Sequence, residues 1–280
     1  MTQDQFNEQY NDFISGLDVD TQAVSDEYSP VDEAIYLLVI AFLLSLQKER
    51  AKYIINNSYY ARLYELRADI LNLFNINENI VPLLNKASDY NIKSHLSLNK
   101  ISDFDVSELR NIHFIERDRR VSSLSGWFER IVLEPILGMV NGMVAGNVSV
   151  TSAKRILAPL KKGEAVSQGL YKASSVATFI KNTIDDATTE IPNLQSNHLV
   201  AKYKFKYFMW VGSLVKNSRP LCVHLITKGG IEMYKNVRYL VATYPQGLYK
   251  GTDETNITQV AGGNRCRHRV FPLRDPRIFI

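Results

Sequence analysis

The sequence predicts an α+β protein with a mostly helical N-terminal region and a small α+β C-terminal domain. Up to about residue 195, apolar residues recur at spacings of three and four, which indicates helices. Beyond that point aromatic and β-branched residues become frequent and glycine-rich turns appear, which indicates strands. We therefore divide the chain into an N-terminal arm, residues 1–30, a helical region for protein contacts, residues 31–195, and a C-terminal domain, residues 196–280.

The composition is that of a globular protein from a reducing compartment. The 280 residues are 45% hydrophobic and 22% charged, and the formal net charge of +4 is mildly basic. This charge is compatible with a position near nucleic acid. Two cysteines do not make a disulfide scaffold, and the polar, acidic N-terminus has no features of a secretory signal.

The first elements are a polar arm and an unusually apolar helix. Residues 1–30 predict an arm with one short helix. Pro30, followed by acidic residues, predicts the start of a helix over residues 31–55. Within it, residues 34–47 are apolar nearly all round but contain only about 13 apolar residues, fewer than the roughly 20 needed to span a bilayer. We therefore expect a core helix or an interface with another chain, and no membrane contact.

The next three segments differ in pattern. Residues 58–75 have the three-and-four spacing of an amphipathic helix. Residues 75–104 are rich in Asn, Ser and Asp, and predict a loop with short helical pieces. Residues 105–120 predict a helix with a polar, mixed-charge face, on which we expect His113 to be packed or solvated rather than a ligand.

Two further helical segments complete the N-terminal region. Residues 125–165 contain Gly138, Gly142 and Gly146 at four-residue spacing, which favours closely packed soluble helices because charged residues interrupt the apolar run. Residues 171–191 predict another helix, which ends before the change in composition.

The C-terminal domain opens with a predicted strand and helix. Residues 200–214 alternate lysines with aromatic residues, which predicts a strand with one wet face. The lysines of this face are Lys202, Lys204 and Lys206. Residues 217–226 predict the entry of a helix, with Ser218 as its N-cap and Pro220 in its first turn.

A second strand is predicted over residues 265–273, after a tight turn at Gly262 and Gly263. On a strand, Cys266 and His268 point to the same side because the side-chain period is two. The residues on the opposite side of this strand are Arg265, Arg267 and Arg269. We expect them to point to water, to DNA or to an acidic partner.

Two Cys-x-His pairs are the candidate chemistry of this domain. Cys266 and His268 converge on the second strand, and Cys222 at the helix start is a third member. His224, two residues after Cys222 on a helix, lies far round the helix and is a weak fourth. Three interpretations stay open: a buried thiol cluster, a structural zinc site made by these four residues, or a Cys222–Cys266 disulfide.

Enzyme signatures are otherwise missing from the sequence. It contains no GxxxxGK[ST], GxGxxG, HExxH or GxSxG motif. We therefore expect a protein that is not an enzyme and that has no cofactor, apart from zinc if the cluster binds it. The alternative is a metal-dependent or cysteine-based hydrolase or nuclease that uses Cys222, Cys266 and His268.

The order of short motifs in the C-terminal domain resembles the Mu F-like, or phage head morphogenesis, minor head proteins. An aromatic strand ending in Trp is followed by Ser-Arg-Pro-x-Cys, a glycine turn, Gly-Gly-Asn-x-Cys-Arg-His and a strand with proline. The matching residues are Trp210, Ser218, Arg219, Pro220, Cys222, Gly229, Gly262, Gly263, Asn264, Cys266, Arg267, His268 and Pro272. The chain departs from the pattern at Asn217, where the family often has Asp, and at Arg265, which separates the asparagine from the second cysteine.

The resemblance implies a structural component of a tailed-phage virion, assembled in the host cytoplasm. Such a protein would lie near the portal vertex in several copies arranged as a ring, and would bind the portal protein, the major capsid protein or both. It would aid head assembly and act in DNA packaging or ejection, with non-specific contact to the packaged DNA.

Overall fold

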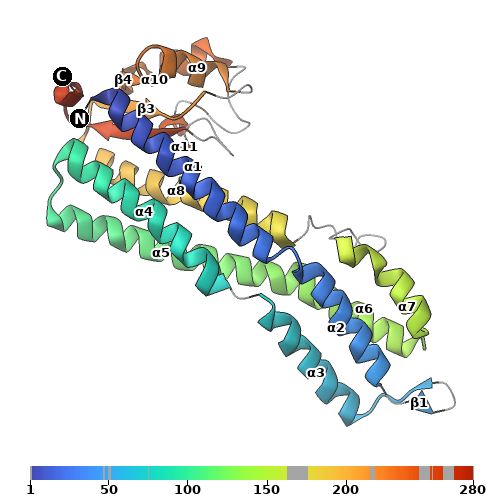
Figure 1. The fold of residues 1–280 in the computed structure, drawn as a ribbon. Helices are drawn as coiled ribbons and strands as arrows, with labels where there is room; N and C mark the ends of the chain where they lie inside the picture. The colour runs from blue at the N-terminus through green and yellow to red at the C-terminus, as the bar shows by residue number, and fades with distance from the viewer. Residues whose placement is uncertain are drawn as a thin grey trace. The chain divides into compact units, whose positions relative to one another are not determined.

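The computed structural model confirms the predicted mostly helical α+β class (Figure 1). The residues that it describes are 2–46, 48–49, 52–74, 76–162, 176–214, 218–245, 253, 255–260 and 268–279. They form long helices and, near the C-terminus, a small antiparallel sheet.

The helices are α1 (Gln3–Glu27), α2 (Val31–Ser45), α3 (Asn57–Asn72), α4 (Ile76–Asn99), α5 (Asp103–Trp127), α6 (Glu134–Ala145), α7 (Val150–Leu157), α8 (Val176–Tyr203), α9 (Pro220–Thr227), α10 (Val237–Thr243) and α11 (Ile257–Val260). A π-helical turn, η1 (Phe128–Leu133), and 3-10 turns η2 (Ala158–Lys162), η3 (Tyr234–Asn236) and η5 (Pro276–Phe279) lie beside them. The strands are β1 (Lys48–Glu49), β2 (Lys52–Tyr53), β3 (Tyr207–Val211), β4 (Ile231–Met233) and β5 (Arg269–Leu273).

The chain forms two compact units, which do not follow the order of the sequence. Unit 1 contains Met1–Thr21, Val81–Arg119 and Ile184–Ile280, and unit 2 contains Gln22–Ile80 and Arg120–Thr183. The boundary predicted near residue 195 therefore falls inside α8, which runs on to Tyr203. The predicted arm, residues 1–30, is divided between the units. Its first 21 residues belong to unit 1, where α1 buries Phe6 and Tyr10 against the sheet.

The sheet of unit 1 is buried on both faces. Its strand order is β4-β3-β5, and both pairs are antiparallel (Figure 1). Met209 of β3 lies opposite Phe271 of β5. One face packs on α1 and α4, and the residues of this cluster are Phe6, Tyr10, Leu98, Met209, Val211, Phe271 and Leu273. The other face packs on α9, α10 and α11, and its cluster is Phe208, Trp210, Leu221, Cys222, Leu225, Val237, Leu240, Ile257 and Val270.

The predicted strand over residues 200–214 is wrong in its first part, because helix α8 continues to Tyr203. Lys202 lies on that helix, where its Nζ binds Asp105 at 2.7 Å and Glu108 at 2.6 Å. Lys204 then ends the helix in the left-handed conformation, with φ at 53°. The three lysines therefore do not form one face of a strand, and β3 begins only at Tyr207.

Two polar segments form long helices where the sequence predicts an arm and a loop. Helix α1 has 25 residues, and Phe6, Tyr10 and Leu17 form its buried side. Helix α4 has 24 residues, although it is rich in Asn and Ser. Its Asn91 and His95 are fully buried, where their side chains find hydrogen-bond partners on α8. A polar side chain that is bonded inside the protein does not break a helix.

Other predicted elements are present. Helix α3 covers most of the amphipathic segment 58–75, and α5 contains the predicted 105–120. His113 is 4% exposed and its Nε2 lies 2.7 Å from Asn85 Oδ1, so of the two alternatives, packed or solvated, the structure shows the packed one.

Unit 2 is built around α2, which packs against α3, α7 and η2. The helix begins after Pro30 as predicted but ends at Ser45. Asp32 is buried in its first turn and accepts a hydrogen bond from the backbone N–H of Val176 at 3.2 Å, at the start of α8. Of the described residues, one helical stretch, Gln3–Ser45, is long and apolar enough to cross a bilayer, a test that buried core helices also pass.

Candidate functional site

The predicted cysteine and histidine cluster lies in a closed core. Cys222 is 1% exposed and shares the apolar cluster under α9 with Trp210, whose ring centroid lies 6.3 Å from that of His268. Cys266 lies outside the described residues, so the zinc site and the disulfide stay predictions. Within the part of the chain that the structure describes, no group of three His, Cys, Asp or Glu side chains is placed to hold a metal ion.

His224 lies on α9 but makes a contact of its own. Its Nδ1 is 2.7 Å from the hydroxyl of Tyr244, and the two rings pack with centroids 4.8 Å apart. Burial lowers the pKa of His224. Because a helix turns about 100° per residue, His224 and Cys222 leave the helix in different directions, as the sequence predicts.

The remaining motif residues are only partly described. Pro220 opens α9 as predicted, and the N-cap is Arg219 rather than the predicted Ser218. Besides Cys266, five more predicted site residues lie outside the described residues: Gly262, Gly263, Asn264, Arg265 and Arg267.

Arg269 was predicted to face water, and this is wrong: the side chain is 2% exposed. The side chains of β5 do alternate between the two faces of the sheet. The face that carries Arg269, however, is covered by α1 and α8 and is not open to water. The Arg269 Nη2 donates a hydrogen bond to the backbone oxygen of Thr188 on α8 at 2.9 Å, and its guanidinium carbon lies 5.6 Å from the Tyr10 ring centre. Arg269 therefore joins β5 to α8 and cannot contact DNA from this position.

A buried chain of polar side chains resembles a catalytic triad in composition. His95 Nε2 lies 2.9 Å from the hydroxyl of Ser196, and the Asn99 Nδ2 lies 3.2 Å from His95 Nδ1. The Asn99 amide is oriented by β5, because its Nδ2 also donates to the Pro272 oxygen at 2.8 Å and its Oδ1 accepts from the Arg274 N–H at 2.9 Å.

This orientation decides the tautomer of His95. An amide Nδ2 only donates, so Nδ1 of His95 must accept, and the ring proton is on Nε2. The Nε2–H then donates to Ser196 and cannot take a proton from it, as a general base would. Burial, and next the charge of Arg269, lowers the pKa of His95 to about 3. These hydrogen-bonded side chains therefore form a structural link from α8 through α4 to β5.

The low pKa of His95 makes unit 1 less stable in mild acid. His95 is neutral when folded, whereas in the unfolded chain it takes up a proton below its ordinary pKa of 6.5. Its contribution to stability is therefore complete above pH 6.5 and is lost as the pH falls toward 3. At about pH 5.5 we expect a loss of about 1.4 kcal/mol relative to about pH 7.5.

The measurement is chemical unfolding of the protein and of His95→Gln at both pH values. Trp210 fluorescence reports on unit 1 when Trp127, which belongs to unit 2, is changed to Phe. The variant should show a weaker pH dependence by this amount. An unchanged pH dependence would mean that His95 has the same pKa in the folded and the unfolded states.

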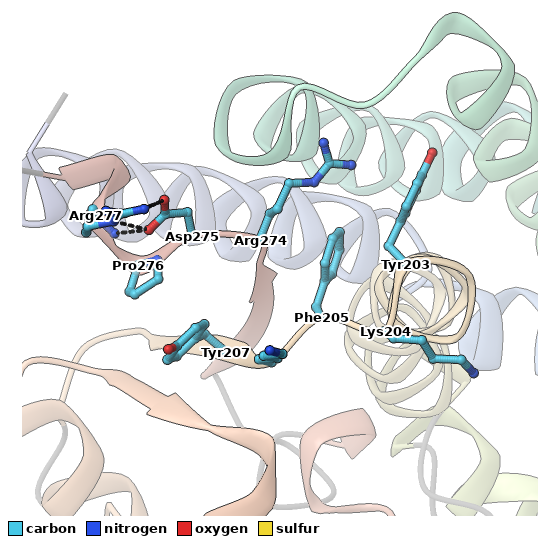
Figure 2. A pocket seen from close by; sticks show the side chains of 9 residues that line it. Tyr203, Lys204, Phe205, Tyr207, Arg274, Asp275, Pro276 and Arg277 are labelled. Carbon is cyan, nitrogen blue, oxygen red and sulfur yellow. Dashed lines mark hydrogen bonds and ion pairs between the residues drawn. The ribbon is translucent and has the colours of Figure 1, made fainter.

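An open hollow on unit 1 gathers exposed basic residues. It has a volume of about 580 Å³ and is formed by two segments, the end of α8 with the start of β3, and the residues after β5. Its lining residues are Tyr203, Lys204, Phe205, Lys206, Tyr207, Arg274, Asp275, Pro276 and Arg277 (Figure 2). We call it the basic hollow.

One end of the basic hollow is fixed by helix α5. Ser102 caps this helix, and Asp105 in its first turn accepts hydrogen bonds from the Ser102 N–H at 2.8 Å and from the Tyr203 hydroxyl at 2.7 Å. Burial alone would raise the pKa of Asp105, but hydrogen bonds led by that of Lys202 hold it below its usual range. The Arg274 guanidinium lies over the Tyr203 ring, 5.1 Å from its centre.

The other end of the basic hollow carries the exposed pair of Arg277 and Asp275 (Figure 2). Arg277 Nη2 lies 2.7 Å from one carboxylate oxygen of Asp275, and the Arg277 N–H donates to the other at 2.9 Å. The side-chain hydrogen bond from Arg277 lowers the pKa of Asp275 to about 2, so this carboxylate is charged at neutral pH.

The basic hollow carries net positive charge that is open to solvent. Four cations less one anion give a charge of +3, and all four cations are exposed. The cations are Lys204, Lys206, Arg274 and Arg277. Such an arrangement can hold phosphate or carboxylate groups of a partner.

Sequence reasoning did not find this site. It noticed two of the lysines, but it did not connect them with Arg274 and Arg277, which lie about 70 residues away along the chain. The pairing of Tyr207 with Leu273 brings the two segments together. The only signal in the sequence is the Arg-Asp-Pro-Arg run that follows the second predicted strand.

Comparison of the chain with protein-family models, with curated proteins and with solved structures gives no match.

Proposed function

We propose that this protein is a structural minor head protein of a tailed phage, similar to the Mu F-like head morphogenesis proteins. In this role it binds the portal protein, the major capsid protein or both in several copies, and it aids head assembly and DNA packaging or ejection. The helical region, residues 31–195, carries the protein contacts. The protein resides in the virion after assembly in the host cytoplasm.

The observation that carries the proposal is that residues from separate parts of the motif pack together in one apolar cluster. Trp210 and Cys222 come from separate pieces of the motif, yet they pack in one apolar cluster with Val270 of β5. The Pro-containing strand lies directly beside the Trp-containing strand, with Phe208 opposite Pro272. A motif whose pieces pack into one small core is expected of a structural module rather than of a chance match.

Burial of the candidate nucleophile favours a structural role over the hydrolase or nuclease alternative. Cys222 is 1% exposed and His268 is 4% exposed, so a substrate cannot reach either side chain in this conformation. A catalytic thiol is found in a partly exposed, electropositive site, whereas Cys222 packs among apolar side chains. The basic hollow contains no residue of this pair.

The test is the location of the protein in particles. Mass spectrometry of purified heads should find it in far fewer copies than the major capsid protein, and cryo-electron microscopy should place it at the portal vertex. Absence from particles would overturn the proposal. Nuclease or hydrolase activity of the purified protein that a chelator abolishes, or that Cys222→Ser removes from a folded protein, would favour the enzyme alternative.

A further inference from the structure

We propose that the basic hollow binds the phosphate backbone of nucleic acid without reading its sequence. Non-specific contact with DNA is what the family resemblance implies, and the new element is the site, which rests on the exposed charge of the hollow and not on the role in head assembly. It also replaces the predicted contact through Arg269, which is buried.

The geometry of the hollow suits phosphate groups. Lys204 and Arg277 lie toward opposite ends of the row of lining residues, with Arg274 between them (Figure 2). A partner with regularly repeated negative charges can therefore meet several cations at once. The planar guanidinium of arginine matches phosphate oxygens with two hydrogen bonds, whereas lysine acts as a point charge.

Arg274 is held ready for such a contact. Its backbone N–H is bonded to Asn99 at 2.9 Å, and its guanidinium rests on the ring of Tyr203. The Tyr203 hydroxyl is in turn bonded to the buried Asp105. A cation that is already positioned loses less conformational entropy on binding than a free side chain.

None of the three aromatic residues of the hollow stands fully open to solvent, and Tyr207 is half-buried against the core of the sheet. Phe205 is 7% exposed and packs near Tyr203, with ring centroids 5.6 Å apart. One face of Tyr203 is occupied by Arg274. Proteins that bind single strands offer open aromatic rings to the bases, so we expect contact with phosphates of duplex DNA and little discrimination between sequences. Phe205 is buried and therefore cannot anchor an acidic peptide.

Asp275 competes with the nucleic acid in this hollow. Its carboxylate already forms an ion pair with the guanidinium of Arg277, with Oδ2 of Asp275 2.7 Å from Nη2 of Arg277. A phosphate must displace it or bind beside it against electrostatic repulsion. Replacement of Asp275 by Asn keeps the oxygen that accepts the Arg277 N–H and removes the charge, so Asp275→Asn should bind DNA more tightly.

The experiment measures fluorescence anisotropy of a labelled mixed-sequence duplex with the full chain. With four phosphate contacts, affinity should fall on the order of 100-fold between about 50 and 200 mM salt. Lys206→Gln/Arg277→Gln should bind about tenfold more weakly at low salt and should lower the salt slope by about two. Asp275→Asn should bind several-fold more tightly.

The control is Lys154→Gln/Arg155→Gln, which removes the same charge from two exposed residues of α7 in unit 2. It should change the affinity less than twofold. Equal weakening by both pairs, or no binding at low salt, would overturn the proposal. So would tighter binding of polyglutamate than of duplex, which would identify an acidic peptide as the partner. Thermal melting with Trp210 fluorescence verifies that each variant is folded, so these failures are distinct from absence of the protein from heads.

Discussion

Replacement of Arg269 by Met is expected to lower the free energy of unfolding of unit 1 by about 2 kcal/mol, although it removes a charge from the core. The reason is a defect in helix α8. Pro192 lies inside this helix and has no N–H, so the backbone oxygen of Thr188, four residues earlier, lacks its usual helical donor. The Nη2 of Arg269 donates to that oxygen at 2.9 Å.

Methionine matches the length of the arginine stem but cannot donate a hydrogen bond. The Thr188 oxygen would then be buried without this donor, which costs about 1–3 kcal/mol. Part of that cost is offset because the guanidinium itself is desolvated: burial lowers the pKa of Arg269, and its Nε and Nη1 have no hydrogen-bond partner among the described residues.

A double-mutant cycle with Pro192→Ala isolates this bond. Alanine restores the backbone N–H to residue 192, so the helix can satisfy the Thr188 oxygen by itself. Arg269→Met should then cost close to nothing, and the coupling between the two sites should be about 2 kcal/mol. Unfolding is followed by Trp210 fluorescence in the Trp127→Phe background. Equal costs of Arg269→Met in both backgrounds would show that the guanidinium does not serve the carbonyl.

The helices with regular apolar spacing could be predicted from the sequence, whereas the polar helix α4 could not. In α3 the apolar spacing predicts an amphipathic helix, and Leu66 and Ile70 do lie on its buried side. In α4, by contrast, the polar residues find their partners more than 100 positions away in the chain. Asn91 bonds Gln195 and Asn99 bonds the Pro272 oxygen. A rule that assigns Asn and Ser to loops cannot include such partners.

The candidate site was missed for a related reason. Period-two alternation in residues 269–273 identifies two faces of a strand but not what covers them. The face that carries Arg269 is covered partly by Tyr10 of α1, from the opposite end of the sequence. The basic hollow likewise depends on the pairing of β3 with β5, which places Lys206 near Arg274. Sequence reasoning could name the charged residues but not their exposure.

Replacement of Gly230 by Ala is expected to destabilise unit 1 by about 3 kcal/mol or more, because the glycine is required by both its backbone and its surroundings. Helix α9 ends in a Schellman motif: the Gly230 N–H bonds the Leu225 oxygen at 2.8 Å and the Gly229 N–H bonds the Ile226 oxygen at 3.1 Å. Gly230 has φ at 77°, in the left-handed region. A Cβ at this position would lie 2.6 Å from the backbone oxygen of Trp210.

Gly229 provides the matched control within the same turn. Its φ of 88° is also left-handed, but a Cβ there would meet no atom within 4 Å. Gly229→Ala should therefore cost only the backbone strain, about 1–2 kcal/mol. The excess cost of Gly230→Ala measures the close approach of the end of α9 to β3, where the Trp210 N–H also bonds the Gly230 oxygen at 2.6 Å. Unfolding followed by Trp210 fluorescence should separate the two variants by about 2 kcal/mol. Equal destabilisation would mean that only the turn, and not the contact with the central strand, requires glycine.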